Sequence, residues 1–482
     1  MDAHYASLLG TRYGGLASNT IDYWMLPDDP TMTAEAVLAA FEGAPVLPAA
    51  TLSLYVHVPF CAQRCRFCAF SGGNSPDTTL ADRYATLLVA QLHDLMRRCP
   101  MQGHPIRAVN IGGGSPDLLG PRIGTVLAAV RGLPGFGADT ELAVEFTLST
   151  VRPPFLDALA EHGVTKVSFG VQSTDRDVRG YMRQPRSLEH LDRALAWMDG
   201  RFPVVNADLI TGMPGQSLAS VEEDLERLMA TPGINAISSY LLTPGAAPSL
   251  LAATAAGKIP PQPDTLTQAL MRLATIGGFR RARWVRRGTN TYVDPTRVGE
   301  RELSRMAGHE CIGASHYEAF LLGVGPQAVT SVPGARIENV VDVAAWCDLV
   351  EQGALPWFTP KCATVHQRDM ALWTFPLRWE GLPAARMADM IAAGACTDAQ
   401  LATLAALELE GLVHARGGGY TLSLLGEVFM GQLVRDLKGE SSRRVIDDYI
   451  AEGRALAASV AQGRATDEYR INDRQRLVVH DD

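Results

Sequence analysis

Two kinds of apolar segment alternate along residues 52–243, and this alternation limits the folds open to the chain. Short β-rich runs begin at residues 52, 108, 141, 166, 204 and 236, and longer runs with helical apolar spacing separate them. About six strand–helix repeats predict a parallel α/β arrangement, either a barrel or an open sheet, and we expect a partial (β/α)6 barrel. In both folds ligands bind at the carboxyl ends of the strands.

The repeat stops near residue 250, and the pattern then changes. Residues 397–437 predict a helix, a short strand, a glycine turn, a second strand and a helix, which is the order of a winged helix. These helices carry few basic residues, so we expect packing or substrate covering rather than DNA binding. The expected parts are an N-terminal extension (1–50), the barrel (51–250), a barrel extension and substrate cover (251–345), a winged-helix-like module (346–440) and a charged tail (441–482).

Charge and hydropathy exclude some functions. The chain has 43 Lys and Arg against 52 Asp and Glu, a net charge of −9, which argues against a general nucleic-acid binder. No apolar run approaches the roughly 20 residues of a membrane helix, and the first residues lack the pattern of a secretory signal. We therefore expect a cytoplasmic protein without nucleic-acid or membrane partners.

Three of the eight cysteines crowd together directly after the strand expected at 52–58. Cys61, Cys65 and Cys68 have C-x3-C-x2-C spacing. Thiolates hold iron–sulfur clusters, and three of them leave one iron of a [4Fe–4S] cubane open to a small molecule. Two alternatives stay open: chance clustering of buried thiols, and a Cys3His zinc site completed by His57. The five other cysteines are scattered and should be dispensable for a cluster.

Four further motifs accompany the cysteines in a fixed order. They are Tyr55–Cys61 (YVHVPFC), Gly112–Pro116 (GGGSP), Val167–Ser173 (VSFGVQS) and Asp208–Gln216 (DLITGMPGQ). Together the motifs resemble those of the radical S-adenosylmethionine (SAM) superfamily. Within it they are similar to the family of the oxygen-independent coproporphyrinogen dehydrogenase, which also includes heme chaperones, anaerobic heme-opening enzymes and class C radical methyltransferases.

The resemblance implies a [4Fe–4S] cluster on the three cysteines, which reduces bound SAM to a 5′-deoxyadenosyl radical. It implies that the Gly112–Gly114 amides hold the methionine portion and that Glu145 lies near the ribose. A reduced flavodoxin or ferredoxin-type protein would supply the electron. The residues expected to contact the cofactor are Tyr55, Phe67, Gly112, Gly113, Gly114, Ser115, Glu145, Gln172, Arg183 and Asp208.

Several family members bind a second SAM beside the first. Phe67, Phe70 and the loop 323–327 (GVGPQ) are placed to line such a pocket. Core packing of the two aromatic rings and a simple turn at the glycines explain the same residues equally well.

The subfamily decides the reaction. The resemblance to coproporphyrinogen dehydrogenases implies a fourth cysteine at the position where this chain has Phe70. The resemblance to heme chaperones implies a typical short motif where this chain has residues 315–320 (SHYEAF). We therefore expect, first, class C one-carbon transfer to an sp2 carbon of a small molecule, which can be aromatic, unsaturated or a tetrapyrrole. The alternatives are oxidative decarboxylation of coproporphyrinogen and, in a different class, non-catalytic heme trafficking.

Two smaller features have both a binding and a structural interpretation. Five arginines surround Trp284 and can grip substrate carboxylates, or they form a solvated surface. They are Arg280, Arg281, Arg283, Arg286 and Arg287. His309 and Cys311 can ligate heme iron or donate protons, or they are ordinary buried or surface residues.

Overall fold

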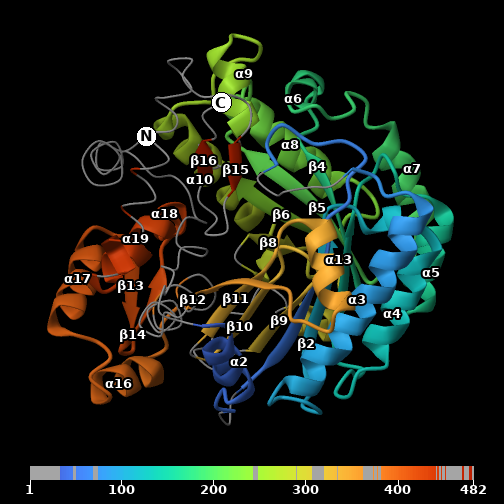
Figure 1. Cartoon of the computed structure of the whole chain (residues 1–482). Helices are drawn as coiled ribbons and strands as arrows, with labels where there is room; N and C mark the ends of the chain where they lie inside the picture. Colours follow the sequence, from blue (N-terminus) through green and yellow to red (C-terminus); the bar gives the residue numbers. More distant parts are fainter. Residues whose placement is uncertain are drawn as a thin grey trace.

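A computed structural model describes most of the chain (Figure 1). The described residues are 33–46, 50–68, 74–242, 248–288, 290–306, 320–333, 335–361, 373, 377, 381–440, 442–444, 447, 451, 469–471 and 477–479. Phe70, His309 and Cys311 and most of the 315–320 segment lie outside them.

Six parallel strands form the centre of the molecule, and each pairs with the next strand along the chain. The expected parallel α/β fold is therefore confirmed. The strands are β1 (Leu52–Val58), β2 (Ile106–Gly113), β3 (Glu141–Phe146), β4 (Lys166–Gln172), β5 (Val204–Thr211) and β6 (Ala236–Leu241).

Further strands extend the sheet beyond β1 on one side and beyond β6 on the other. The sheet has twelve strands in the order β12-β11-β10-β9-β1-β2-β3-β4-β5-β6-β8-β7. Strand β9 pairs with β1 in parallel, whereas β10, β11, β12, β8 and β7 join by antiparallel pairing. No pairing within the described chain closes it into a barrel. The added strands are β7 (Val285–Arg286), β8 (Thr291–Val293), β9 (Phe320–Val324), β10 (Val329–Val332), β11 (Ala335–Asn339) and β12 (Trp357–Lys361).

Residues 320–332 form two strands, β9 and β10. A turn separates β9 from β10, and Gly325 within it has φ +97°, a conformation that favours glycine. The sequence pattern missed the turn because the apolar residues run on through it.

Helices connect the parallel strands. Asp77 caps the first of them by accepting a hydrogen bond from the Leu80 amide, and Gly163, with φ +67°, follows the end of another. The helices of the main body are α2 (Ala34–Glu42), α3 (Thr78–Arg98), η1 (Pro116–Arg122), α4 (Ile123–Arg131), α5 (Pro153–Glu161), α6 (Arg176–Tyr181), α7 (Glu189–Met198), α8 (Leu218–Ala230), α9 (Pro248–Ala255), α10 (Thr265–Arg281), α11 (Glu300–Arg305) and α13 (Val343–Glu351).

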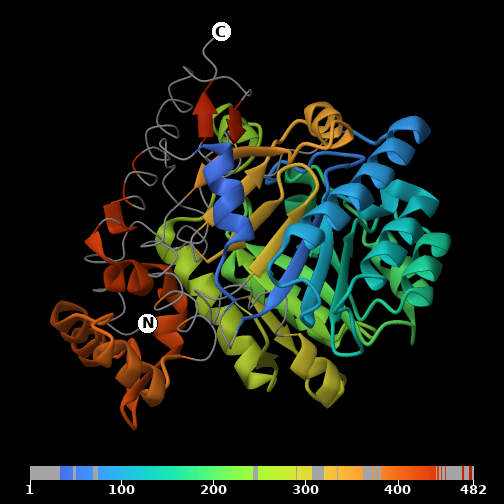
Figure 2. The ribbon, with the colours of Figure 1, turned by 60° about the horizontal axis from the view of Figure 1, so that its bottom comes forward.

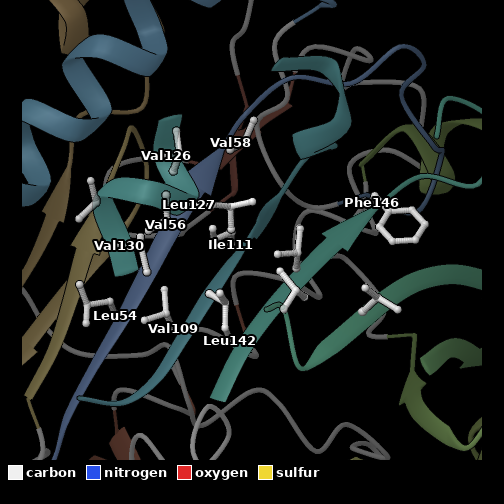
Figure 3. Packing of buried hydrophobic residues seen from close by; sticks show 14 of the residues in the cluster. Leu54, Val56, Val58, Val109, Ile111, Val126, Leu127, Val130, Leu142 and Phe146 are labelled. Carbon is white, nitrogen blue, oxygen red and sulfur yellow. The ribbon is translucent and has the colours of Figure 1, made fainter. Parts of the chain in front are cut away.

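The outer face of the sheet is apolar and packs against these helices. Leu54, Val56 and Val58 of β1 point to this face, and Val126 and Leu127 of α4 cover it (Figure 3). All five side chains are almost completely buried. Alternate residues of each strand supply this core, because successive side chains of a strand point to opposite faces.

The inner face of the same strands is polar. Ser53 and His57 of β1 are buried there, between the apolar positions of the outer face. The corresponding positions of the next strands hold Asn110, Ser168 and Asn206, which are also buried. Buried polar side chains require hydrogen-bond partners, so this face is a candidate binding surface rather than a second apolar core.

The C-terminal module has a core of its own and follows the expected winged-helix order. Ala269 and Ile276 of α10 join this core, so α10 connects the module to the main body. Figures 1 and 2 show the orange-to-red module beside the sheet, away from α3, α4 and α5. Its elements are α16 (Ala384–Ala392), α17 (Asp398–Leu409), β13 (Val413–Arg416), β14 (Gly419–Leu422), α18 (Leu424–Val428) and α19 (Met430–Leu437).

Helix α13 belongs to the main body, since Trp346 and Cys347 are buried in the same core as the outer face. We therefore propose that the module begins after β12, later than residue 346. A separate two-stranded pair, β15 (Tyr469–Ile471) with β16 (Leu477–Val479), follows the module. In the described part of the chain no helix has the length and apolarity needed to cross a bilayer.

Candidate active site

The three clustered cysteines lie on the loop that follows β1, at the carboxyl edge of the sheet. Each is partly exposed. Contacts from distant elements fix this loop: the Arg66 amide donates to the Met182 carbonyl at 3.1 Å, and the Arg66 guanidinium donates to the Tyr181 carbonyl at 2.5 Å. The Ser249 hydroxyl of α9 donates to the Arg66 carbonyl at 2.9 Å. The thiols are therefore held by α6 and α9 as well as by β1.

Burial raises the pKa of Cys61 and of Cys65 to about 11, and the negative charge of the neighbouring thiolates adds to the effect. Cys68 acts on both groups, so the three sulfur atoms lie within electrostatic reach of one another. Bound iron ions, which carry positive charge, would offset this repulsion and favour the thiolate form of the cysteines. The donor set therefore fits an iron–sulfur cluster.

No three His, Cys, Asp or Glu side chains of the described residues are arranged to hold a single metal ion. A cubane differs from a single ion, because each thiolate binds a separate iron. The His57 ring is buried and shares a hydrogen bond of 3.0 Å with the Tyr55 hydroxyl through Nδ1. The geometry therefore disfavours the alternative of a Cys3His zinc site.

The glycine segment after β2 is joined to the beginning of the cysteine loop. The Gly114 amide donates to the Val58 carbonyl and the Ser115 amide to the Phe60 carbonyl, both at 2.7 Å. A Cβ atom on Gly114 would lie 2.3 Å from the Phe60 oxygen, so glycine is required there. The Gly114 amide is thus engaged within the protein, contrary to the expectation that all three glycine amides face the cofactor. The Ser115 hydroxyl is also engaged, by Asp117 and by the Thr147 amide.

Gly112 and Gly113 leave room for two polar side chains of the inner face. A Cβ atom on Gly112 would meet the Glu145 carboxylate, and one on Gly113 would meet the His57 ring. Gly113 has φ +102°, which favours glycine. Glu145 accepts from the Asn110 amide group at 2.9 Å and from the Gly113 backbone at 3.4 Å. Glu145 therefore stands directly beside the glycine segment.

Asp208 lies farther along the inner face, on β5. It accepts from the Asn206 side chain at 2.8 Å and from the Ser168 hydroxyl at 3.3 Å. Burial, and next the negative charge of Glu145, raise the pKa of Asp208 to about 7. Near neutral pH this carboxyl group can therefore accept or donate a hydrogen bond, as the binding of sugar hydroxyls requires.

Gln172 and Arg183 both have a left-handed backbone, with φ of 68° and 58°. Gln172 ends β4 at a register shift against β5, and its buried Oε1 atom has no hydrogen-bond partner among the described residues. Arg183 is exposed and directly follows Met182, the anchor of the cysteine loop. Strained backbone and unsatisfied polar atoms are concentrated at binding sites.

The remaining expected contacts are also located. Tyr55 faces inward on β1 near Glu145, and burial followed by that carboxylate raises its pKa. Phe67 packs against an apolar cluster that includes Val178 and Met213. In the loop 323–327, Gly323 pairs with Tyr55, and the Gly325 amide donates to Gln91 at 2.8 Å. This loop therefore lies beside β1, next to the Tyr55 side of the site.

The structure adds residues that no motif indicated. Arg179 of α6 is buried and donates to the carbonyls of Val171 and Pro185, both at 2.6 Å. Burial lowers its pKa, whereas its neighbours Asp224 and Cys65 act to raise it. Asn110, Ser168 and Asn206 were missed as well, although their inward register beside Glu145 and Asp208 is a signal that the sequence contains.

The arginines around Trp284 separate into different environments. Arg281 and Arg283 are exposed. Arg280 and Arg286 approach Glu427 of α18, at 2.7 and 4.0 Å. Arg287 follows β7, and its amide donates to the Thr291 carbonyl at 2.9 Å. The five arginines therefore lie in different environments and do not form one common patch.

A hollow of about 380 Å³ lies elsewhere, at the amino ends of β5 and β6. Pro203, Asn235 and Arg297 are among the residues that line it. It opens at the edge of the sheet opposite the thiols, so it is not the site of their chemistry.

Residues 55–228 match the Radical SAM superfamily. The chain contains a radical SAM domain. Proteins of this superfamily use a [4Fe–4S] cluster and SAM. The matched segment begins at Tyr55 and ends in α8, so it covers β1 to β5 together with the cysteine loop.

Relatives of two kinds are similar to this chain. It is 27% identical to the anaerobic coproporphyrinogen III oxidase 1 of Cereibacter sphaeroides over 321 residues, 64% of this chain and 69% of the relative. It is 27% identical to the heme chaperone HemW of Mycobacterium tuberculosis over 427 residues, 82% of this chain and 97% of the relative. The solved structure of the coproporphyrinogen III oxidase HemN from Escherichia coli superimposes with a TM-score of 0.69 at 21% identity, covering 86% and 96% of the chains. The fold is therefore that of HemN.

Proposed function

We propose that this protein binds a [4Fe–4S] cluster through Cys61, Cys65 and Cys68, cleaves SAM reductively, and acts on a tetrapyrrole. The observation that carries the proposal is the placement of the three thiols. The loop that bears them is fixed at the carboxyl edge of the sheet, against the glycine segment 112–114 and the polar inner face. The bound cluster would supply the electron that breaks the sulfonium bond of SAM.

The protein residues bind and orient the cofactor. The backbone around Gly112 and Gly113 allows close approach, because neither residue has a Cβ atom. Glu145 and the partly protonated Asp208 are placed to bind hydroxyl groups, and Gln172 contributes its unpartnered Oε1 atom. The His57 imidazole is neutral near pH 7, because burial lowers its pKa to about 4, and its bond with Tyr55 orients both rings.

The relatives support a tetrapyrrole as the substrate. A coproporphyrinogen oxidase and a heme chaperone are both similar to this chain, and the fold matches HemN. We therefore place oxidative decarboxylation of a porphyrinogen ahead of one-carbon transfer to an sp2 carbon. Each reaction leaves its own product: carbon dioxide and a vinyl group from decarboxylation, or S-adenosylhomocysteine from methyl transfer.

Heme binding is the second candidate function. The alignment with the heme chaperone extends over 97% of that relative, and it covers more of this chain than the alignment with the oxidase does. A chaperone would retain heme on purification and form no product from coproporphyrinogen.

One anaerobic assay separates these functions. The protein is reconstituted with iron and sulfide, reduced with dithionite and incubated with SAM, with and without coproporphyrinogen III. Mass spectrometry then measures 5′-deoxyadenosine, S-adenosylhomocysteine and vinyl products. We expect 5′-deoxyadenosine in both reactions and vinyl products only with the porphyrinogen. S-adenosylhomocysteine would favour methyl transfer, and the absence of 5′-deoxyadenosine would overturn the proposal.

A further inference from the structure

Arg287 occupies a distinctive position at the edge of the inner face. The antiparallel pairs Val285–Val293 and Arg286–Tyr292 continue to Arg287 and Thr291, where the Arg287 amide donates to the Thr291 carbonyl at 2.9 Å. Directly paired residues point to the same face of a sheet. Arg287 therefore shares the face of Thr291, whereas Arg286 points to the opposite face, toward Glu427.

That shared face is the inner one. The Thr291 hydroxyl shares a hydrogen bond of 2.8 Å with Ser238 of β6, and Ser238 donates to Asn206 at 3.1 Å. Asn206 in turn donates to Asp208. A chain of hydrogen bonds thus runs from Thr291, opposite Arg287, to the carboxyl group expected to bind the cofactor.

Arg287 also lies at the edge of the sheet that carries the thiols. Strand β8 runs antiparallel to β6, and its first residue, Thr291, pairs with Ser238, three residues before β6 ends. The Ser239 amide donates to the carbonyl of Asn290 at 2.9 Å. Arg287, which follows β7, and Asn290, which precedes β8, therefore lie at the carboxyl edge, the edge that also carries the thiols.

The half-buried Arg287 side chain has an unsatisfied donor among the described residues. Its Nε atom is buried, and no hydrogen bond or ion pair is formed by the side chain within the described part of the protein. Arg280, seven residues earlier, instead binds Glu427 at 2.7 Å. A buried donor without an acceptor is costly, and a guanidinium pairs best with a carboxylate or phosphate.

We propose that Arg287 binds a carboxylate of the substrate at this edge of the inner face. The inference rests on the proposed function, since porphyrinogens with propionate side chains carry such groups at their rim. In the order of the strands, β7 is at the far end of the sheet from β1. A porphyrinogen has several carboxylates around its rim, so one of them can lie at Arg287 while another part of the same ligand lies at the thiol site.

The test is a binding titration of the reconstituted protein, followed by porphyrin fluorescence. The probes are coproporphyrin III and its tetramethyl ester, which lacks the carboxylates. We expect R287A to weaken coproporphyrin binding about 10- to 100-fold, the loss of one charge-assisted pair. Ester binding should be equal in the two proteins. R281A, which removes an exposed arginine of the same segment, should bind like the wild type.

Three results would overturn the inference. If R287A folds poorly, R287Q takes its place, and unchanged coproporphyrin binding by the folded variant would exclude the contact. Equal binding of acid and ester by the wild type would exclude it without any variant. If the wild type binds neither porphyrin, the proposed substrate class fails together with the carboxylate contact. Formation of 5′-deoxyadenosine without substrate should be equal in R287A and the wild type, because Arg287 is not part of the cofactor site.

Discussion

The two faces of the central sheet are built from the same strands and serve different purposes. The outer face, with Leu54 and Val56, is buried under helices and is mainly apolar. The inner face, with His57 and Asn110, is buried too, yet it depends on a network of hydrogen bonds. Successive side chains of a strand point to opposite faces, so one segment supplies residues to both faces. Substitutions should therefore separate stability from chemistry according to the face they alter.

The largest effect should come from the loop above the inner face. C65A removes one of three thiols that would hold the cluster, and we expect complete loss of cluster iron and of SAM cleavage. Because Cys65 is partly exposed on a loop, the melting temperature of the iron-free protein should change little. Iron analysis and visible absorption measure the first effect, and circular dichroism the second. C396A, in the separate core of the module, is the matched control. Full iron content in C65A would refute the assignment of the ligands.

The outer face should respond in the opposite way. L54A removes a fully buried side chain from the packed core, and we expect it to lower the free energy of unfolding by about 2–5 kcal/mol. Denaturant unfolding measures this loss. The fraction of protein that remains folded should still bind iron after reconstitution. If L54A kept the free energy of unfolding of the wild type but lost iron binding, the roles of the two faces would not be separable.

A pair of glycines tests the close contacts of the inner face. Gly113 and Gly103 both have positive φ, but a Cβ atom would touch the His57 ring only at Gly113, whereas nothing lies within 4 Å at Gly103. We expect G103A to cost about 1 kcal/mol from backbone strain and G113A about 3 kcal/mol, because a steric clash is added. Chemical unfolding of the two variants gives the difference. Equal losses of stability in the two variants would show that backbone strain alone, and not a clash with the His57 ring, lowers the stability.

The smallest effect concerns the pH dependence of stability. Asp208 has a pKa of about 7 in the folded protein, above its ordinary value near 3.8. The folded state therefore holds the proton more tightly, and its stability falls as pH rises from about 4 to about 7. D208N abolishes this titration. The free energy of unfolding of the variant should therefore rise, relative to that of the wild type, by on the order of 2 kcal/mol between pH 4.5 and pH 8, allowing for partial exposure of Asp208. Parallel stability curves for the two proteins would contradict the shifted pKa.

Much of the fold was predictable because its signals are local. All six parallel strands were expected to begin within two residues of where they are observed to begin, since each is a short apolar run between turns. The cysteine motif was visible for the same reason. Strands β7 and β8 have only two and three residues, too few for a period to emerge, and β9 and β10 merged into one apolar run.

The site was less predictable where it depends on distant contacts. The anchoring of Arg66 by Met182 and Ser249 joins elements that no local spacing connects. The buried position of Arg179 beside Cys65 follows from the packing of α6, and nothing in its own segment indicates it. The engagement of the Gly114 amide by Val58 also arises only when β1 and β2 are paired.

The anchoring of the cysteine loop also has a consequence for biosynthesis. The contacts of Arg66 bridge 115 residues to Tyr181 and 183 residues to Ser249. At roughly 5–20 residues per second, translation takes on the order of 10–40 seconds to pass from Cys68 to Ser249. Throughout that interval the thiols belong to a nascent chain in which the Ser249 partner of Arg66 has not yet been made. Iron that binds before Ser249 has been made would therefore meet a loop that still lacks this contact.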